Sequence, residues 1–473
     1  MNKLIIGLIC FASSCYAQMQ TPSNDSVIGD WEGTIQQVGL KLVFHIKTEN
    51  GLLQSSMDSP MQGAFKIPCS LTELKNGELL IELAALNAFY KGTLNISDQT
   101  ISGSWNQGGA ALPLVLTRKT EKIEIKRQTP LPPFSYSSRE VEFTNSQKDV
   151  TYGATLTYPS QQRQNLTAII LVSGSGPQDR DGTIGSHKPF LVIADELSKK
   201  GFVVLRIDDR GVGKTTGASG KFTTKDLSND LMEAVKYLRS LRDLSIAKIG
   251  LLGHSEGGIV TSEEAANDTG IAFVILLATP GIAIRDLLVE QNEAIMQQAG
   301  IKQETIDSYL QFYKDITSTI PKSKSPAEAL TTTQRKFREW SRKAGKEITE
   351  ASTGVTDSVT EKAFIKTVVG QFYSDWFRTL IDYEPKSVLK KIVCPVLALN
   401  GEKDVQVLAK SNLNGIRLSL KFNPKTEIKE ISGLNHLFQT CKSCSPVEYF
   451  ALEETFSPDV LNIITTWLEG VAN

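Results

Sequence analysis

The stretch Gly253-His254-Ser255-Glu256-Gly257 has the G-x-S-x-G spacing that places a serine on a tight turn between a strand and a helix. The apolar run 246–252 before it predicts a short buried strand, and residues 258–266 can begin a helix. The glycines suit this turn because only small residues let the backbone double back and leave the serine oxygen exposed. Ser255 is therefore the candidate nucleophile for acyl transfer.

A serine hydroxyl is a weak nucleophile near neutral pH and needs an adjacent base, which is usually a histidine. The chain has four histidines: His45, His187, His254 and His436. Where a serine elbow of this kind occurs, the acid and then the histidine follow it along the chain. Only His436 follows, so it is the candidate base. We interpret His254 as a structural residue of the turn, His187 as a pocket-lining candidate and His45 as a strand residue.

The acid that orients the histidine should lie at the same edge of the sheet as the serine. The apolar, strand-like run 392–400 ends in a turn that carries Glu402 and Asp404. We predict Asp404 as the acid. Glu402, which is nearer the end of the strand, is the second choice.

Acyl transfer also needs N–H donors for the oxyanion that develops in the transition state. The backbone N–H of Glu256, next after the nucleophile, is one expected donor. The strand-like run 166–172 leads into the Gly/Ser-rich turn 173–177, whose amides could face a substrate oxygen, and the Ser175 N–H is our candidate for the second donor. This chemistry requires no metal and no organic cofactor.

Gly213-Lys214-Thr215 looks like the end of a phosphate-binding loop, G-x-x-x-x-G-K-[ST]. The first glycine of that motif would fall at position 208, which is Asp208, so the pattern fails and no nucleotide binding is expected. We interpret 208–210, Asp-Asp-Arg, as a salt-bridged loop after a strand.

Residues 1–17 have the pattern of a secretory signal peptide, with Lys3 ahead of a short apolar run and a cut expected after Ala17. Acylation of Cys15, as in a lipoprotein, is a weaker alternative. Later parts of the sequence offer no apolar stretch of about 18 residues, the length that spans a bilayer. The expected location is therefore secreted or periplasmic.

The 473 residues exceed one ordinary domain, and 51 basic against 52 acidic residues give a net charge of −1. This overall balance does not favour a nucleic acid or an anionic membrane surface as a partner. In an exported protein, Cys441 and Cys444 could form a local disulfide. Cys69 and Cys394 are expected as buried thiols.

Residues 25–120 read as an all-β domain, because short strand-like runs alternate with turns such as Glu49-Asn50-Gly51. The spacing suggests a small barrel or sandwich. Trp31 and Trp105 could line a glycan-binding face, although core packing is the favoured interpretation. A proline-containing linker is expected over 121–140.

Residues 141–473 alternate strands with amphipathic helices, which predicts a doubly wound, mostly parallel sheet. The strand rhythm stops after residue 281 and resumes near residue 392. The intervening helix-like segment, about 282–390, is expected to form a lid that selects substrates. The lid aromatics could line the pocket or form the core of the lid; they are Phe372, Tyr373, Trp376 and Phe377.

Four motifs occur in order along the chain: 174–181 (GSGPQDRD), 187–190 (HKPF), 208–214 (DDRGVGK) and 253–258 (GHSEGG). With them the sequence, over about residues 145 to 470, resembles secreted bacterial α/β-hydrolases of the EstD-like carboxylesterase type, which are close to serine aminopeptidase-like hydrolases. The resemblance implies an α/β-hydrolase fold and a triad of Ser255, Asp404 and His436. Ser173-Gly174 stands where many relatives have His-Gly.

These features together predict a secreted serine carboxylesterase that hydrolyses small or medium esters through an acyl-enzyme. A serine peptidase acting on small peptides would use the same groups and is the alternative. An alternative of another class is a glycan-binding protein with a vestigial hydrolase domain, in which the N-terminal domain would contact the glycan.

Overall fold

The structure is a computed structural model of the chain, and it describes residues 23–36, 40–49, 51–59, 64–86, 88–107, 110–119, 126–161, 164–218, 220 and 222–471. The chain divides into two compact units, residues 1–121 and 122–473. The expected signal peptide, residues 1–17, lies outside the described residues. The expected linker, 121–140, extends too far, because the first strand of the second unit already begins at Tyr136.

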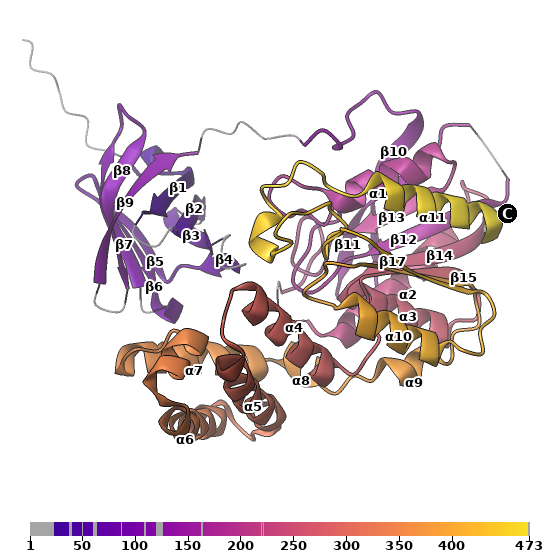
Figure 1. Cartoon of the computed structure of the whole chain (residues 1–473). Helices are drawn as coiled ribbons and strands as arrows, with labels where there is room; N and C mark the ends of the chain where they lie inside the picture. The colour runs from indigo at the N-terminus through magenta and orange to yellow at the C-terminus, as the bar shows by residue number, and fades with distance from the viewer. Residues whose placement is uncertain are drawn as a thin grey trace, which may run out of the picture. The chain divides into compact units, whose positions relative to one another are not determined.

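The first unit is one antiparallel sheet of nine strands in the order β4-β3-β2-β1-β9-β8-β7-β6-β5. It is a curled meander, closer to a half-barrel than to a sandwich of two sheets (Figure 1). The strands are β1 (Gly29–Ile35), β2 (Leu40–Glu49), β3 (Leu52–Ser59), β4 (Ala64–Pro68), β5 (Leu71–Lys75), β6 (Glu78–Leu83), β7 (Ala88–Asn95), β8 (Thr100–Gln107) and β9 (Ala110–Arg118).

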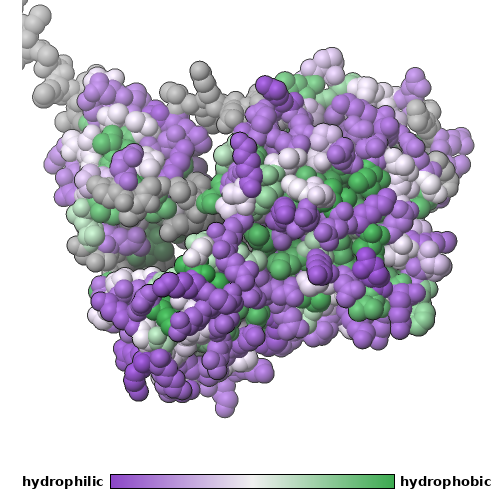
Figure 2. Space-filling model, in the orientation of Figure 1, coloured by the Kyte–Doolittle hydropathy of each residue, from purple (hydrophilic) through white to green (hydrophobic). Residues whose placement is uncertain are grey.

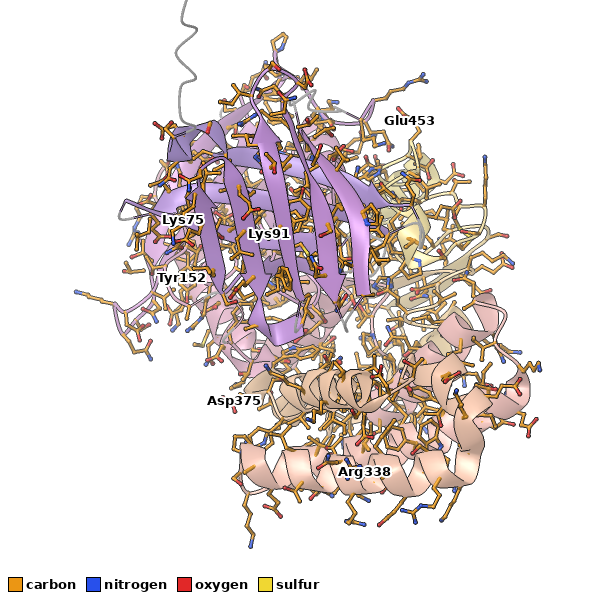
Figure 3. All side chains as sticks on the ribbon, turned by 90° about the vertical axis from the view of Figure 1, so that its left-hand side faces the viewer. Lys75, Lys91, Tyr152, Arg338, Asp375 and Glu453 are labelled. Carbon is orange, nitrogen blue, oxygen red and sulfur yellow. A yellow bond between two sulfur atoms is a disulfide. The ribbon has the colours of Figure 1, made fainter. Side chains whose placement is uncertain are left out.

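Alternation along these strands separates an apolar inner face from a polar outer face. In β7 every second residue is buried, while Lys91 points outward (Figure 3). Trp31 and Trp105 are 0% and 2% exposed and belong to the core. The favoured interpretation, core packing, is therefore confirmed for both tryptophans, and the alternative of a glycan-binding face formed by them is wrong.

The second unit contains an eight-stranded sheet in the order β10-β11-β13-β12-β14-β15-β16-β17. Both pairs that involve β11 are antiparallel, and the pairs from β13 to β17 are parallel, which confirms the predicted mostly parallel sheet. The strands are β10 (Tyr136–Thr144), β11 (Thr151–Pro159), β12 (Leu166–Val172), β13 (Val203–Ile207), β14 (Ile246–His254), β15 (Ile271–Leu277), β16 (Val396–Gly401) and β17 (Thr426–Ile431).

Helices cover both faces of this sheet, because its strands are apolar on both sides. Helices α1 (Pro189–Lys199) and α11 (Pro458–Val471) pack on one face, and a second group packs on the other (Figure 1). The second group is α2 (Thr224–Ser240), α3 (Glu256–Asn267), α9 (Pro385–Leu389) and α10 (Ala409–Ser419).

A helical insertion separates β15 from β16, where the strand rhythm of the sequence stops. Its helices are α4 (Ile284–Gln298), α5 (Gln303–Thr319), α6 (Pro326–Thr353), α7 (Ser358–Phe372) and α8 (Asp375–Leu380). They share an aromatic core that includes Phe337, Phe372 and Phe377, and this core also packs against Ile259 of α3. Hydrophilic residues cover most of the visible outer surface of these helices (Figure 2).

In the described part of the chain, none of the helices has both the length and the apolar character needed to cross a bilayer. Cys441 and Cys444 form a disulfide. Cys69 and Cys394 carry free thiols, as expected, but they are only partly buried and not buried.

The two units have separate cores, so a core mutation should destabilise its own unit. Phe44 is fully buried against Tyr90 and Trp105. Its replacement by alanine should lower the free energy of unfolding of the first unit by about 3–5 kcal/mol. Scanning calorimetry of the full chain should show a shift in one transition for Phe44→Ala. The matched variant Phe337→Ala should shift the other transition. Movement of both transitions in either variant would contradict the separation.

Candidate active site

Ser255 stands on the tight turn that its sequence predicts, between the end of β14 and the start of α3. Its backbone has φ 54° and ψ −122°, a conformation that non-glycine residues rarely adopt and that is typical of functional positions. The turn is held because the Ser255 N–H donates to the Leu277 carbonyl (2.8 Å) and the Gly258 N–H donates to the Ser255 carbonyl (2.9 Å).

Close packing explains the two flanking glycines of the motif. A Cβ on Gly253 would lie 2.2 Å from the Gly257 carbonyl oxygen, and a Cβ on Gly257 would lie 2.2 Å from that of Val172. Since Val172 ends β12, the second contact presses the elbow against the strand that leads into residues 173–177. Side chains at either glycine would push these elements apart.

His436 and Asp404 are in direct contact. The His436 Nδ1 donates a hydrogen bond of 2.7 Å to Asp404 Oδ2, and both side chains are almost completely buried. Asp404 also accepts from the main-chain N–H groups of Gln406 (2.8 Å) and Val407 (2.9 Å) and from the Asn400 amide (3.3 Å). Four donors hold this carboxylate, and the bond at Nδ1 leaves the His436 Nε2 as the ring atom that can act as a base.

Glu402 has a different role from Asp404. It accepts hydrogen bonds from the Ser432 hydroxyl (2.7 Å) and the Gly433 N–H (3.0 Å), which lie in the loop that leads to His436. The hydrogen bond from Ser432 is the main reason that the pKa of Glu402 falls to about 2. Glu402 therefore braces the histidine loop and does not contact the His436 ring.

His254 links the elbow to the histidine loop. Its Nε2 lies 2.9 Å from the His436 carbonyl oxygen, and because a carbonyl only accepts, Nε2 carries the proton. The two rings are 4.8 Å apart between centroids. Burial lowers the pKa of His254 to about 4, so this ring is neutral near pH 7. The sequence identified His254 as structural but not its partner.

Ser255 is connected to the His436–Asp404 pair through the adjacent residue His254, whose ring bonds to the His436 carbonyl. Among the described residues, no hydrogen bond connects the Ser255 hydroxyl to the His436 ring. Bonds of this kind are often long in unliganded enzymes and tighten when a substrate binds, so this geometry does not remove either group from the site.

The loop after β12 lies against Ser255. A Cβ on Gly174 would be 3.2 Å from the Cβ of Ser255, and the adjacent Ser175 is exposed to solvent. Asp209 anchors this loop by accepting from the Gln178 N–H (2.8 Å) and the Ser173 hydroxyl (3.1 Å). The salt-bridge interpretation of 208–210 therefore fits Asp208 and Arg210, which pair with Arg180 and Asp230, but not Asp209.

The side chain of Glu256 connects the elbow to the helical insertion. It is 2% exposed and accepts from the Thr224 hydroxyl (2.6 Å) and from the indole N–H of Trp376, which lies 3.0 Å from both of its oxygens. Trp376 belongs to α8, so the insertion touches the residue whose N–H is a candidate oxyanion donor. The near-helical spacing of the aromatics in the sequence did not distinguish this tryptophan from Phe372 and Phe377, which lie in the core of the insertion.

The described residues include no group of three His, Cys, Asp or Glu side chains placed to hold a metal ion. The Cys441–Cys444 disulfide lies just after the histidine loop, and the Cys441 N–H bonds back to the Gly433 carbonyl (3.4 Å). The disulfide therefore closes a short loop next to the segment that carries His436.

A strand, a serine elbow and a helix, followed in the chain by an acid and a buried histidine at the same sheet edge, define an α/β-hydrolase. The sequence matches the family described as the alpha/beta hydrolase fold over residues 168–427, and the chain belongs to that family.

Among curated proteins, the chain is similar to esterase EstD of Thermotoga maritima, with 26% identity over 283 residues. The match covers 60% of this chain and 57% of EstD. An uncharacterised 31.7 kDa protein of Escherichia coli is 22% identical over 58% of this chain and 83% of its own length.

The chain is also similar to several solved structures. The Pyrococcus furiosus esterase Pf2001 aligns with a TM-score of 0.42 and 16% identity, over 72% of this chain and 94% of the esterase. A proline iminopeptidase of Mycobacterium smegmatis aligns with a TM-score of 0.42 and 16% identity, over 71% of this chain and 99% of its own.

The raised pKa of Asp209 predicts how the contribution of this residue to stability depends on pH. Burial, with smaller contributions from Asp230 and Glu256, raises this pKa from 3.8 to about 7. The folded protein therefore binds a proton that the unfolded chain releases between about pH 4 and pH 7, and this contribution to stability is lost as the pH rises through that window.

The Asp209→Asn variant lacks this ionisation and keeps an oxygen that can accept from the Gln178 N–H. The free energy of unfolding of the variant minus that of the wild type should therefore increase as the pH rises from 4 to 7. Urea unfolding at several pH values measures the difference, in which the opposite effect of His254 cancels. A difference that stays constant with pH would contradict this account of Asp209.

Proposed function

We propose that the protein is a serine carboxylesterase in which Ser255, His436 and Asp404 form the catalytic triad. The observation that carries the proposal is the 2.7 Å bond between His436 and Asp404 at the sheet edge where Ser255 occupies its strained turn. The similarity to esterase EstD supports the ester substrate class.

In the proposed mechanism, the His436 Nε2 takes the proton of the Ser255 hydroxyl as the oxygen attacks the ester carbonyl. The oxyanion is bound by the backbone N–H of Glu256 and by that of Ser175, in the loop next to Gly174. His436 then protonates the departing alcohol and activates the water that hydrolyses the acyl-enzyme. Asp404 keeps the ring oriented and stabilises its protonated form.

The helical insertion is the element that would select the acyl or alcohol group, as a lid over the site. Its contact with the elbow through Trp376 and Glu256 supports this role. We further propose that the protein is exported, with residues 1–17 as its signal. The Cys441–Cys444 disulfide agrees with an oxidising compartment.

Replacement of Ser255 by alanine should lower ester hydrolysis by about 10⁴-fold or more, because the nucleophile acts as a unit with its base. The rates are measured with p-nitrophenyl acetate, butyrate and octanoate, and with aminoacyl p-nitroanilides in parallel. The matched control is Ser262→Ala, which removes another hydroxyl from α3. A Ser255→Ala protein as active as the wild type would refute the triad, and faster cleavage of the amides would identify a peptidase.

The Trp376→Phe variant tests whether the insertion acts on the elbow. It removes the indole N–H from the buried Glu256 carboxyl group, which keeps the Thr224 hydroxyl at Oε1 but loses its donor at Oε2. An unsatisfied buried polar atom costs about 1–3 kcal/mol. We expect kcat for butyrate esters to fall by about tenfold, since about 1.4 kcal/mol of barrier corresponds to that factor. Trp340→Phe removes an indole N–H that bonds to Ser308 inside the insertion, and it should leave kcat unchanged. Equal effects of the two variants would contradict the coupling.

A further inference from the structure

Three large apolar side chains are exposed at the amino edge of the second sheet. Val393 is 66% exposed, Leu418 is 59% exposed and Phe422 is 87% exposed. Val393 lies in the loop between α9 and β16, and the other two lie at the end of α10 and just after it. Exposure of this extent costs free energy in water unless another surface covers the side chains.

The three side chains belong to one surface. The side-chain amide of Asn423, next to Phe422, donates to the carbonyls of Ile392 (3.2 Å) and Cys394 (2.8 Å), on either side of Val393. These bonds tie the loop before β16 to the loop that follows α10. Leu418 lies in the last turn of α10, four residues before Phe422 in the chain. Figure 2 shows hydrophobic residues among hydrophilic ones in the region where Figure 1 places α9 and α10.

Basic side chains surround this surface. Lys390 and Lys391 follow α9, and Lys421 and Lys425 follow α10. We call these four lysines, together with Val393, Leu418 and Phe422, the basic–apolar patch. All four lysines are exposed, and among the described residues none forms an ion pair with a carboxylate. Lys421 lies with its Nζ 4.7 Å from the centre of the Phe422 ring.

The two sequence segments that carry the patch contain no carboxylate. No Asp or Glu occurs between Glu384 and Glu402, and none occurs between Asp404 and Glu427. Asp268, in the loop before the neighbouring strand β15, is paired with Arg239 at 2.8 Å. The patch therefore has a local excess of positive charge in a chain whose net charge is only −1.

We propose that the basic–apolar patch docks the protein on the surface of an anionic lipid bilayer. Apolar side chains that enter the boundary between headgroups and acyl chains, within a ring of lysines that face anionic headgroups, are the two components of peripheral membrane binding. A nucleic acid would meet the lysines but would leave Val393 and Leu418 without a partner, so the bilayer fits the whole surface better.

Docking in this way keeps the candidate active site away from the bilayer. Val393 and Lys425 precede the parallel strands β16 and β17, whereas Ser255 follows the end of the parallel strand β14. A six-residue strand such as β16 is about 20 Å long, so the patch and Ser255 lie on opposite edges of the sheet. The docked enzyme would act on substrates in the aqueous phase. This proposal does not depend on the identity of those substrates.

Co-sedimentation of the full chain with vesicles tests the proposal. The vesicles contain either phosphatidylcholine alone or phosphatidylcholine mixed with phosphatidylglycerol, at low and at moderate salt. We expect binding only to the anionic vesicles, and weaker binding as salt rises, because salt screens the lysines. The same measurement is made with Lys390→Gln, Lys391→Gln, Lys421→Gln and Lys425→Gln combined, which should bind about tenfold or more weakly.

The matched control combines Lys314→Gln, Lys343→Gln, Lys362→Gln and Lys366→Gln, which removes the same charge from exposed lysines of the insertion. The control should bind like the wild type. Leu418→Ser with Phe422→Ser should also weaken binding, and a variant that fails to fold is recognised by its circular dichroism. Hydrolysis of soluble p-nitrophenyl acetate by the folded patch variants should equal that of the wild type, and Ser255→Ala should bind vesicles normally.

The proposal is overturned if the wild type does not bind phosphatidylglycerol vesicles, or if the patch variant and the matched control bind them equally. Retention by single-stranded DNA without vesicle binding would also overturn it, in favour of a polyanion. If neither the wild type nor any variant hydrolyses esters while vesicle binding is as expected, the proposed function is refuted and the docking proposal is supported.

Discussion

The fixed position of the Asp404 carboxylate is the constraint on which the rest of the candidate site depends. Two main-chain N–H groups, the Asn400 amide and the His436 ring all donate to it, and its side chain has no exposed surface. A buried carboxylate held by four donors cannot turn, so it determines which nitrogen of His436 carries the proton. The direction of that ring then determines where a base is available.

The histidine loop needs support from more than its acid. Glu402 holds the loop from one side through Ser432 and Gly433, and His254 holds it from the other side through the His436 carbonyl. These two residues do not contact the reacting atoms of the proposed chemistry. They limit the movement of the main chain that carries the base, which is what a reaction between positioned groups requires.

The order of the strands explains why these groups meet. Strand β12 lies between β13 and β14, so the strand order reverses at this point of the sheet. In open α/β sheets, ligands bind outside the carboxyl ends of the strands at such a point. Ser255 follows β14, and the loop held by Asp209 follows β12. The opposite edge of the same sheet carries the basic–apolar patch, so each edge of one rigid layer presents a different chemistry.

The sequence by itself determined the local features and their order. The elbow at Ser255, the position of His436 as the sole histidine after it, and the alternation of strands and helices are all properties of short segments, in which spacing dictates geometry. The sequence also placed both candidate acids, Glu402 and Asp404, in the turn directly after the strand β16.

Only the tertiary structure decided which distant groups touch. It brought Asp404 and not Glu402 to His436, turned Trp31 and Trp105 into the core, and joined Trp376 to Glu256 across 120 positions of the chain. His254 and His436 are 182 positions apart. Such contacts depend on strand order, on the curl of a sheet and on the packing of an insertion. These are set by the burial of the whole apolar surface, and no local spacing encodes them.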